Sequence, residues 1–287
     1  MRPAVIAISS HVARGAVGNR SIVNALETFG FPVWAVPTVL LPYHPGHGRA
    51  TRIEPDPVLF KPFLDDLLAS KWFGETGAII TGYMANAAQA EKVGEFVAAA
   101  RKANPRLVYL CDPVIGDTNG LYVAEATAAA IRDHLLPQAD IATPNLFELG
   151  WLAGCERPGD PVAAVAAARR LGPSMVLVTS APAYMRGNTA NLLVERESAT
   201  LAEHRLVNGP GNGSGDLVAG LFLALLLSGS TPVEALEKVS ASIFEIMSRA
   251  ARRGSDELMP QADTQSLLNP LSAVTLRAIA RPATLRT

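Results

Sequence analysis

The sequence predicts an α/β protein built on a doubly wound, mostly parallel sheet with helices on both faces. Apolar runs rich in β-branched residues alternate with helical patterns along most of the chain. The apolar runs are continuous rather than alternating in polarity, as expected of strands that helices cover on both sides. Polar residues repeatedly follow the carboxyl ends of these runs, which is the sheet edge where this architecture binds its ligands.

The expected strands are Ala4–Ser9, Val33–Val39, Ala78–Thr81, Leu107–Cys111, Ile141–Thr143, Met175–Thr179 and Asn191–Val194. Helices are expected near residues 18–29, 57–70, 86–103, 121–135, 145–153 and 160–171. Beyond Asp216 the pattern is helical, over 216–228, over 232–252 after the helix-opening pair Thr231-Pro232, and near 261–269. No repeat or linker divides the chain, so we expect one domain over residues 1–281 and a loose tail over 282–287.

Composition excludes several classes of protein. Of the 287 residues 49% are hydrophobic and the mean hydropathy is +0.21, which indicates a large core rather than disorder. A net charge of −1 without a basic patch argues against nucleic acid as a partner. Cys111 and Cys155 form neither a disulfide framework nor a zinc motif, and fit a reducing cytoplasm. The longest apolar run, Leu217 to Leu227, is too short to span a membrane, and the N-terminus lacks a signal-peptide pattern.

The most informative segment is the glycine-rich stretch from Asn208 to Asp216, which leads directly into an apolar helical pattern. Glycines let backbone N–H groups converge on an anion, and the first turn of a helix adds further unpaired N–H groups. A carboxylate at this place, Asp216, can accept a proton from an attacking alcohol. The stretch fits neither the P-loop nor the dinucleotide fingerprint, and predicts the catalytic loop of a small-molecule kinase. The alternative is a plain turn in which Asp216 only caps a helix.

Polar segments follow five of the expected strands. They are Ser9-Ser10-His11, Thr81-Gly82-Tyr83, Cys111-Asp112-Pro113-Val114, Thr143-Pro144-Asn145 with Phe147-Glu148, and Thr179-Ser180. Each alone is an ordinary transition from strand to loop. Together with Gly215-Asp216 they predict a site along one edge of the sheet.

In these segments, from about residue 4 to residue 260, the chain resembles the pyridoxal kinases of the ribokinase-like superfamily. Further matching residues are Val12, Gly15, Val17-Gly18-Asn19, Thr38-Val39, His44 and Gly48. The resemblance implies a kinase that uses ATP and Mg²⁺ to phosphorylate the 5′-hydroxymethyl group of pyridoxal, and also of pyridoxamine or pyridoxine. Its product would be pyridoxal 5′-phosphate, made by vitamin B6 salvage, and the enzyme would be a homodimer.

The resemblance also implies roles for single residues. Asp216 is the base, with a pKa depressed by the helix N-terminus, and Gly213, Ser214 and Gly215 supply N–H groups to the transferring phosphoryl group. Asp112 and Glu148 hold Mg²⁺ on the ATP phosphates, and Asn145 reaches the phosphates or the waters of the metal. Thr143, Thr179 and Ser180 contact the phosphates or a K⁺ ion, while Leu206 and Val207 contact adenine. The glycines of the turn from Gly116 to Tyr122 allow a hinge that covers ATP.

On the substrate side, the resemblance implies that Ser10 bonds the pyridine ring, Val17 and Tyr83 pack on it, and His44 lies in the substrate loop. This loop departs from the family, because Pro45-Gly46-His47 replaces a threonine and a tyrosine found in many members. Pro45 has no donor, and His47 is expected to compensate. Two alternatives stay open: a hydroxymethylpyrimidine kinase of the same superfamily, and a non-catalytic B6-binding protein. A dehydrogenase is set aside because the early glycine fingerprint is missing.

Overall fold

Strand and helix alternate through the first two thirds of the chain in the computed structural model, which describes residues 2–209 and 211–279. The elements are β1 (Ala4–Val12), α1 (Asn19–Thr28), β2 (Val33–Leu41), α2 (Pro57–Ala69), β3 (Thr76–Thr81), α3 (Ala87–Ala103), β4 (Val108–Cys111), β5 (Gly116–Asp117), β6 (Gly120–Leu121), α4 (Glu125–Ala130), β7 (Ile141–Ala142), α5 (Leu146–Leu152), α6 (Pro161–Ala168) and β8 (Met175–Ala181). After them come β9 (Asn188–Glu195), β10 (Ala199–Arg205), α7 (Ser214–Leu227), α8 (Pro232–Arg253), α9 (Thr264–Leu268) and β11 (Thr275–Ala278).

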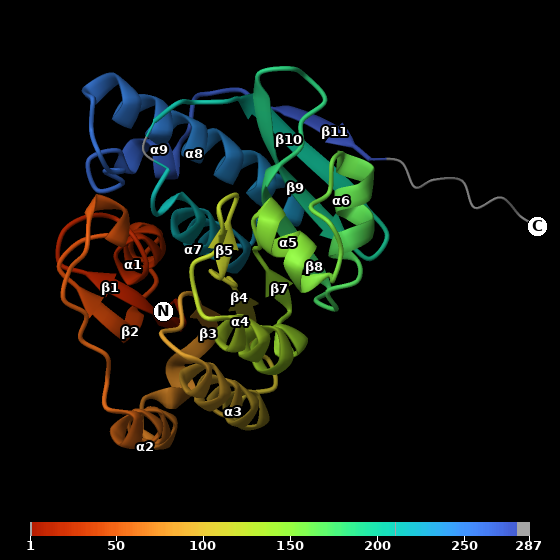
Figure 1. The fold of residues 1–287 in the computed structure, drawn as a ribbon. Coiled ribbons are helices and arrows are strands. Elements are labelled where there is room, and N and C mark those ends of the chain that lie inside the picture. Colours follow the sequence, from red (N-terminus) through yellow and green to blue (C-terminus); the bar gives the residue numbers. More distant parts are fainter. Residues whose placement is uncertain (1, 210, 280–287) are drawn as a thin grey trace, which may run out of the picture.

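Within the described residues the main sheet has nine strands in the order β11-β10-β9-β8-β7-β4-β3-β1-β2 (Figure 1). The strands from β2 to β8 in this order are parallel, and β9, β10 and β11 pair antiparallel at the far edge. Because β1 lies between β2 and β3, the winding reverses beside β1, and a ligand site is expected at the carboxyl ends of the strands there. The predicted doubly wound, mostly parallel α/β class is confirmed.

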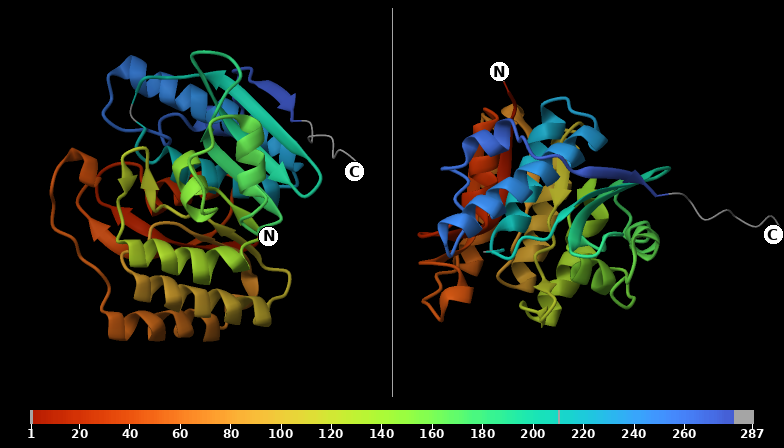
Figure 2. Two further views of the ribbon diagram at one scale, coloured as in Figure 1. Left: turned by 45° about the vertical axis from the view of Figure 1, so that its right-hand side comes forward. Right: turned by 90° about the horizontal axis from the view of Figure 1, so that it is seen from above.

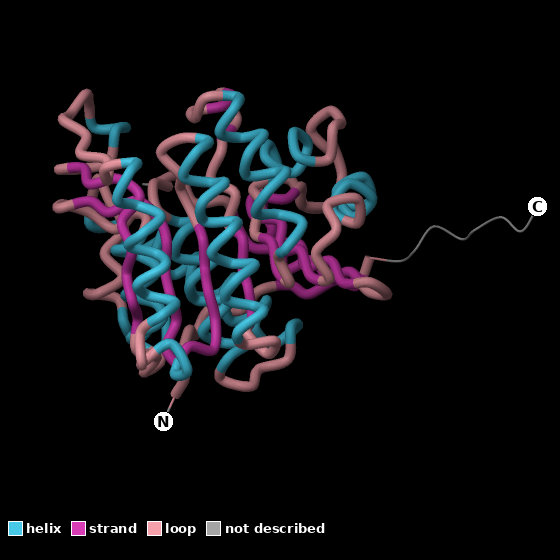
Figure 3. The backbone as a smooth tube through the Cα atoms, turned by 90° about the horizontal axis from the view of Figure 1, so that it is seen from below, coloured by secondary structure: helices cyan, strands magenta, loops and turns pink. Residues whose placement is uncertain are grey.

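Two apolar cores lie on the two faces of the sheet. Val5 and Ala7 of β1 belong to one core, together with side chains of α1, α7 and α8. Ile6 and Ile8 belong to the other, together with α2, α3 and α6. This alternation along one strand explains why the sequence shows a continuous apolar run, since both faces are covered. The two layers of helices are visible in Figure 2, and Figure 3 shows the loops gathered at the strand ends.

Several expected elements need correction. The helix expected over 121–135 begins only at Glu125, because Gly116–Leu121 form the β5–β6 hairpin. Strands β10 and β11 were not predicted, and residues 275–278 are strand, not part of a wholly helical end. Strand β10 was missed because it contains polar residues, which do not predict a buried strand. One of them, Glu203, is nevertheless buried, and its carboxylate accepts the backbone N–H groups of Tyr184 and Met185. The predicted tail over 282–287 lies outside the described residues.

Helix starts follow the local signals. Thr231 and Glu234 form a reciprocal capping box at α8, with Pro232 in the first turn. None of the helices in the described ranges is long and apolar enough to cross a membrane.

Asn19 ties the start of α1 to two strands. Its buried Nδ2 donates to the Ser9 carbonyl (3.0 Å) and to the Val36 carbonyl (3.1 Å), beside a shift of register between β1 and β2. Asn19→Ala leaves both carbonyls without a donor, so we expect the free energy of unfolding to fall by about 2–3 kcal/mol. Urea unfolding measures this. Asn119→Ala, on an exposed turn, is the control, and equal midpoints for the two variants would contradict the prediction.

Candidate active site

The carboxyl ends of β3, β4 and β7 bring the predicted polar residues together. The backbone ladder continues past the strands, from Asp112 N–H to the Thr81 carbonyl (2.9 Å) and from Thr143 N–H to the Cys111 carbonyl (3.1 Å). A cavity of about 860 Å³ opens above this edge. Every site residue predicted from the sequence lines it: Ser10, Val17, His44, Pro45, Gly46, Tyr83, Asp112, Thr143, Asn145, Glu148, Thr179, Ser180, Leu206, Val207, Gly213, Ser214, Gly215 and Asp216.

The glycine-rich loop forms one wall of the cavity and ends in helix α7. Gly213 precedes the helix in the left-handed conformation (φ 79°), and a Cβ there would lie 1.8 Å from the Ala16 carbonyl oxygen. Only glycine fits this close approach. A Cβ at Gly215 would meet no atom within 4 Å, so the first turn of α7 is open to a ligand. Asp216 lies in this first turn.

Asp216 is enclosed more tightly than the sequence suggests. Its Oδ1 is buried and has no hydrogen-bond partner among the described residues. Burial raises the pKa of Asp216 from 3.8 to about 6, although the N–H groups of Gly18 and of Asp216 itself act in the opposite direction. The expectation of a depressed pKa is therefore wrong, because it considered the helix N-terminus and not the loss of water. A carboxylate with one unpartnered oxygen and a raised pKa fits a group that receives a proton.

Asp112 and Glu148 share the cavity with Asp216. Burial, then the charges of Glu148 and Asp216, raise the pKa of Asp112 well above its ordinary value, while a hydrogen bond from Thr143 (3.0 Å) opposes this. Burial likewise raises the pKa of Glu148 to about 7. In the described parts of the chain, no basic side chain forms an ion pair with any of the three carboxylates. The site therefore concentrates uncompensated negative charge.

Glu148 also has a structural role. It forms a capping box with Asn145 at the start of α5, in which Glu148 Oε2 accepts the Asn145 N–H (2.9 Å). Its other oxygen accepts the N–H groups of Ile115 (2.8 Å) and Gly116 (3.4 Å). The Asn145 amide donates to the Gly116 carbonyl (2.8 Å). Both residues therefore fix the β5–β6 hairpin to α5, in addition to any role toward a nucleotide.

Among the described residues, two other than glycine have positive φ, and both line the cavity: Val114 (47°) and Ser180 (52°). For a β-branched residue such as Val114 this conformation is strained. The turn at Val114 directs the next two N–H groups, of Ile115 and Gly116, onto Glu148. Strain at this position is consistent with a functional site.

Another part of the cavity wall is built around Tyr83. Its N–H donates to Ser9 Oγ (3.1 Å) and its carbonyl accepts from Thr38 Oγ1 (2.7 Å), so the backbone is held from two strands. The Arg52 guanidinium donates to the Tyr83 hydroxyl (3.2 Å). Burial and the neighbouring His47 lower the pKa of His44, whose Nδ1 accepts the Gly46 N–H (3.0 Å). A neutral His44 then carries its proton on Nε2.

His47 does not compensate for Pro45 as expected. It is absent from the cavity wall, and its Nε2 lies 3.0 Å from the carboxylate of Glu257. The cavity also has walls that sequence reasoning missed, among them Arg52, Arg157, His204, Ile243 and Met247. They come from loops, from β10 and from α8, and no local pattern marks them.

The residues present fit a magnesium ion that is shared with phosphates. Carboxylate oxygens are suitable ligands, and a divalent cation would relieve the repulsion among Asp112, Glu148 and Asp216. Across the described ranges, no group of three or more His, Cys, Asp or Glu side chains is placed to hold a metal alone. Mg²⁺ is usually bound by one or two carboxylates, and waters and substrate phosphates complete its coordination shell.

Comparison with known proteins identifies the family. Residues 74–260 match the family model described as phosphomethylpyrimidine kinase. The chain is 36% identical to the pyridoxal kinase PdxY of Rubrobacter xylanophilus, over 96% of this chain and 97% of that one. The chain belongs to the pyridoxal kinase family. It is also 38% identical to the pyridoxine/pyridoxal/pyridoxamine kinase of Bordetella avium, with 90% of each chain covered.

Solved structures of pyridoxal kinases share the fold. The pyridoxal kinase of Leishmania donovani, in complex with ADP and pyridoxamine, superposes with a TM-score of 0.90 and is 28% identical. The match covers 97% of this chain and all of that one. This chain is therefore a pyridoxal kinase family member with the ribokinase-like fold.

The raised carboxylate pKa values predict a pH effect on stability. Folding raises the pKa of Asp216 from 3.8 to about 6, so the folded protein binds this proton more tightly than the unfolded chain does. The resulting contribution of Asp216 to the free energy of unfolding is full below pH 4 and is lost as the pH rises through 6. We expect ligand-free Asp216→Asn to be about 3 kcal/mol more stable than the parent at pH 8, and this difference to fall to about 1 kcal/mol at pH 4.5.

Urea unfolding at the two pH values measures this difference. The comparison of variants is needed because burial lowers the pKa of His44 and His204, which acts on stability in the opposite direction. The exposed Asp66→Asn is the matched control, and the same pH dependence in both variants would contradict the assignment.

Proposed function

We propose that this protein is an ATP-dependent kinase that phosphorylates the 5′-hydroxymethyl group of pyridoxal, and also acts on pyridoxamine or pyridoxine. The observation that carries the proposal is the buried, unpartnered oxygen Oδ1 of the Asp216 carboxylate. It lies in the first turn of α7, beside the glycine-rich loop and in the same cavity as Asp112 and Glu148. The names of the relatives, and the ADP and pyridoxamine bound to the Leishmania donovani enzyme, support the same substrates.

In this proposal the substrate hydroxyl oxygen forms a bond to the γ-phosphorus of ATP. The bond from that phosphorus to the β-phosphate oxygen breaks, and ADP leaves. Asp216 takes the hydroxyl proton; with a pKa of about 6 it is ionised at neutral pH yet basic enough to receive it. Gly213, Ser214 and Gly215 present N–H groups to the charge on the transferring oxygens.

We propose that the cations bind on the nucleotide side. Asp112 and Glu148 would hold Mg²⁺, which when bound neutralises phosphate charge and orients the γ-phosphoryl group. Thr143, Thr179 and Ser180 are candidate contacts for the phosphates or for K⁺. Asn145 would assist there, and Leu206 and Val207 would contact adenine at the far end of the cavity. Comparing rates in potassium and sodium buffers tests the K⁺ requirement.

On the substrate side, Ser10 is proposed to bond the polar atoms of the ring, and Val17 and Tyr83 to pack on it. His44, Pro45 and Gly46 would close this end. We also propose a cytoplasmic homodimer. Two free cysteines fit the compartment. Exposed apolar side chains on α2, namely Val58, Leu59 and Phe63, offer a face for a second copy.

A second candidate is phosphorylation of a hydroxymethylpyrimidine. The description of the matching family model favours it, since that model spans residues 74–260 and includes Asp112, Glu148 and Asp216. Both substrates are flat heteroaromatic alcohols. ADP release with pyridoxal, pyridoxine, pyridoxamine and hydroxymethylpyrimidine, measured in parallel, decides between them. Binding of B6 vitamers without any ADP release would instead indicate a non-catalytic binding protein.

Asp216→Asn tests the base. The amide keeps the size of the side chain but cannot take the proton, so we expect kcat to fall by about 10²–10⁴-fold while ATP still binds. Coupled ADP release measures kcat, and calorimetry measures ATP binding. Ser228→Ala, at the other end of the same helix, is the control. Retention of most of the turnover in Asp216→Asn would overturn the assignment.

Asp112→Asn tests the metal role. Removing one carboxylate weakens the hold on Mg²⁺, so we expect the magnesium concentration for half-maximal rate to rise about tenfold or more, with a smaller change in the KM for pyridoxal. Asp117→Asn lines the same cavity on an exposed turn and is the matched control. An unchanged magnesium dependence in Asp112→Asn would count against the role.

A further inference from the structure

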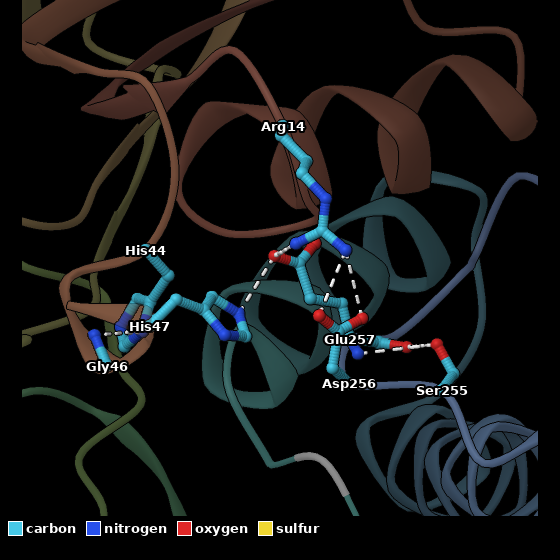
Figure 4. Close-up of polar contacts among 7 residues, drawn as sticks. All are labelled: Arg14, His44, Gly46, His47, Ser255, Asp256 and Glu257. Carbon is cyan, nitrogen blue, oxygen red and sulfur yellow. Dashed lines mark hydrogen bonds and ion pairs between the residues drawn. The ribbon is translucent and has the colours of Figure 1, made fainter.

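Glu257 is a buried carboxylate outside the cavity that contacts two loops next to it. It follows α8 in the chain, and its side chain is only 9% exposed. One oxygen, Oε1, lies 3.0 Å from Arg14 Nη1 and 3.0 Å from His47 Nε2 (Figure 4). Its Oε2 lies so close to Gly15 that a Cβ there would be 2.1 Å away. The carboxylate is therefore fixed from several sides.

Both contacted loops lie against the glycine-rich loop. On one side, the segment that follows Arg14 places the Ala16 carbonyl oxygen 1.8 Å from the position that a Cβ on Gly213 would occupy. On the other, the turn Pro45–His47 places Gly46 beside Asn212, with a Cβ position 3.4 Å from the Asn212 amide nitrogen. Glu257 thus lies behind both of the segments that flank the catalytic loop.

The turn that Glu257 holds carries cavity residues on its other face. His44, Pro45 and Gly46 line the cavity, whereas His47 turns away to Glu257. Within the turn, the contacts among described residues are short-range ones, from Gly46 N–H to His44 Nδ1 and from His47 N–H to the His44 carbonyl. The 3.0 Å contact of His47 Nε2 with the Glu257 carboxylate therefore joins this turn to the carboxyl-terminal part of the fold.

Neighbouring acids do not share this position. Asp256 pairs with Arg14 through both oxygens but is largely exposed, and although the charge of His47 acts on it, no hydrogen bond or ion pair among the described residues joins it to the turn. Asp263 is fully buried and pairs with Arg253 within the carboxyl-terminal segment. Among these acids, Glu257 alone contacts a residue of the substrate loop.

From these contacts we propose that Glu257 and His47 are positioning residues for the alcohol substrate. The contact between the His47 ring nitrogen and the Glu257 carboxylate fixes the turn 44–47, and with it His44 and Gly46, against the glycine-rich loop. Pro45 has no N–H with which to fix the turn from the cavity side. The contact between His47 and Glu257 fixes the turn from outside the cavity instead. The statement about substrate rests on the proposed function; the statement about the turn does not.

The kinetic test uses His47→Ala, a partly exposed position where the substitution leaves the core intact. We expect the KM for pyridoxal to rise about tenfold, because the substitution removes the contact with the Glu257 carboxylate. We expect kcat and the KM for MgATP to change less than about threefold. His47→Gln, which still offers a donor to Glu257, should restore most of the KM. Glu257→Ala should raise the KM at least as much, and adding His47→Ala to it should raise it little further.

Asp256→Asn is the matched control, because it removes an acid beside the same Arg14 and leaves the His47 contact in place. We expect its KM values to equal those of the parent protein. A KM for pyridoxal in His47→Ala within twofold of the parent, or no rescue by His47→Gln, would overturn the proposal. So would an equal effect on the KM values of both substrates, since that indicates a general loss of structure.

Hydrogen exchange on the ligand-free protein gives a test that needs no turnover. In His47→Ala and Glu257→Ala, the amides of residues 44 and 46–48 should exchange about tenfold faster, while those of α7 keep their protection. Unchanged exchange in 44–48 would overturn the positioning role by itself. If the parent protein turns over no B6 vitamer but the exchange result holds, the proposed function fails and the role of Glu257 in fixing the turn stands.

Discussion

The repulsion among three carboxylates shapes the rest of this site. Asp112, Glu148 and Asp216 lie in one cavity without a basic partner among the described residues, and burial raises the pKa of each. The fold tolerates them because Thr143 and backbone N–H groups bond the carboxylates. Such an arrangement is unfavourable in the ligand-free protein, and a divalent cation bound with phosphates would relieve the repulsion. Much of the local architecture, including the strained turn at Val114, serves to hold these charges in place.

The parts of the fold and site that the sequence predicts are those encoded by local pattern. Polar residues after apolar strands identify Asp112 and Thr143, and the glycine-rich stretch identifies Asp216, because parallel strands end at the same edge. Arg157 and His204 escaped prediction, since only the tertiary fold brings their segments to the cavity. The pKa of Asp216 was predicted in the wrong direction, because a helix N-terminus can be read from sequence while the exclusion of water cannot.

The turn 44–47 is where the resemblance predicts a departure from the family, and the structure shows which residue holds this turn. Pro45 removes a possible donor from the cavity, and His47 bonds a carboxylate behind it instead of facing the substrate. Order in this loop therefore depends on a residue that is distant in sequence, Glu257. His44 lines the cavity, whereas Glu257 lies outside it and contacts the turn that carries His44. A sequence motif identifies cavity residues such as His44 but not the residues that position them.

The attachment of the β5–β6 hairpin to α5 has a consequence for how a nucleotide binds. Glycines at both ends of this hairpin suggested a hinge, yet Glu148 and Asn145 bond it to the cap of the helix. Lifting the hairpin would break the bonds from the Ile115 and Gly116 N–H groups to Glu148 and from the Asn145 amide to the Gly116 carbonyl, and would leave one oxygen of a buried carboxylate without donors. This wall of the cavity is therefore already ordered before ligand arrives. When a ligand binds against this wall, the protein loses little conformational entropy. Selectivity at this wall comes from a preformed surface.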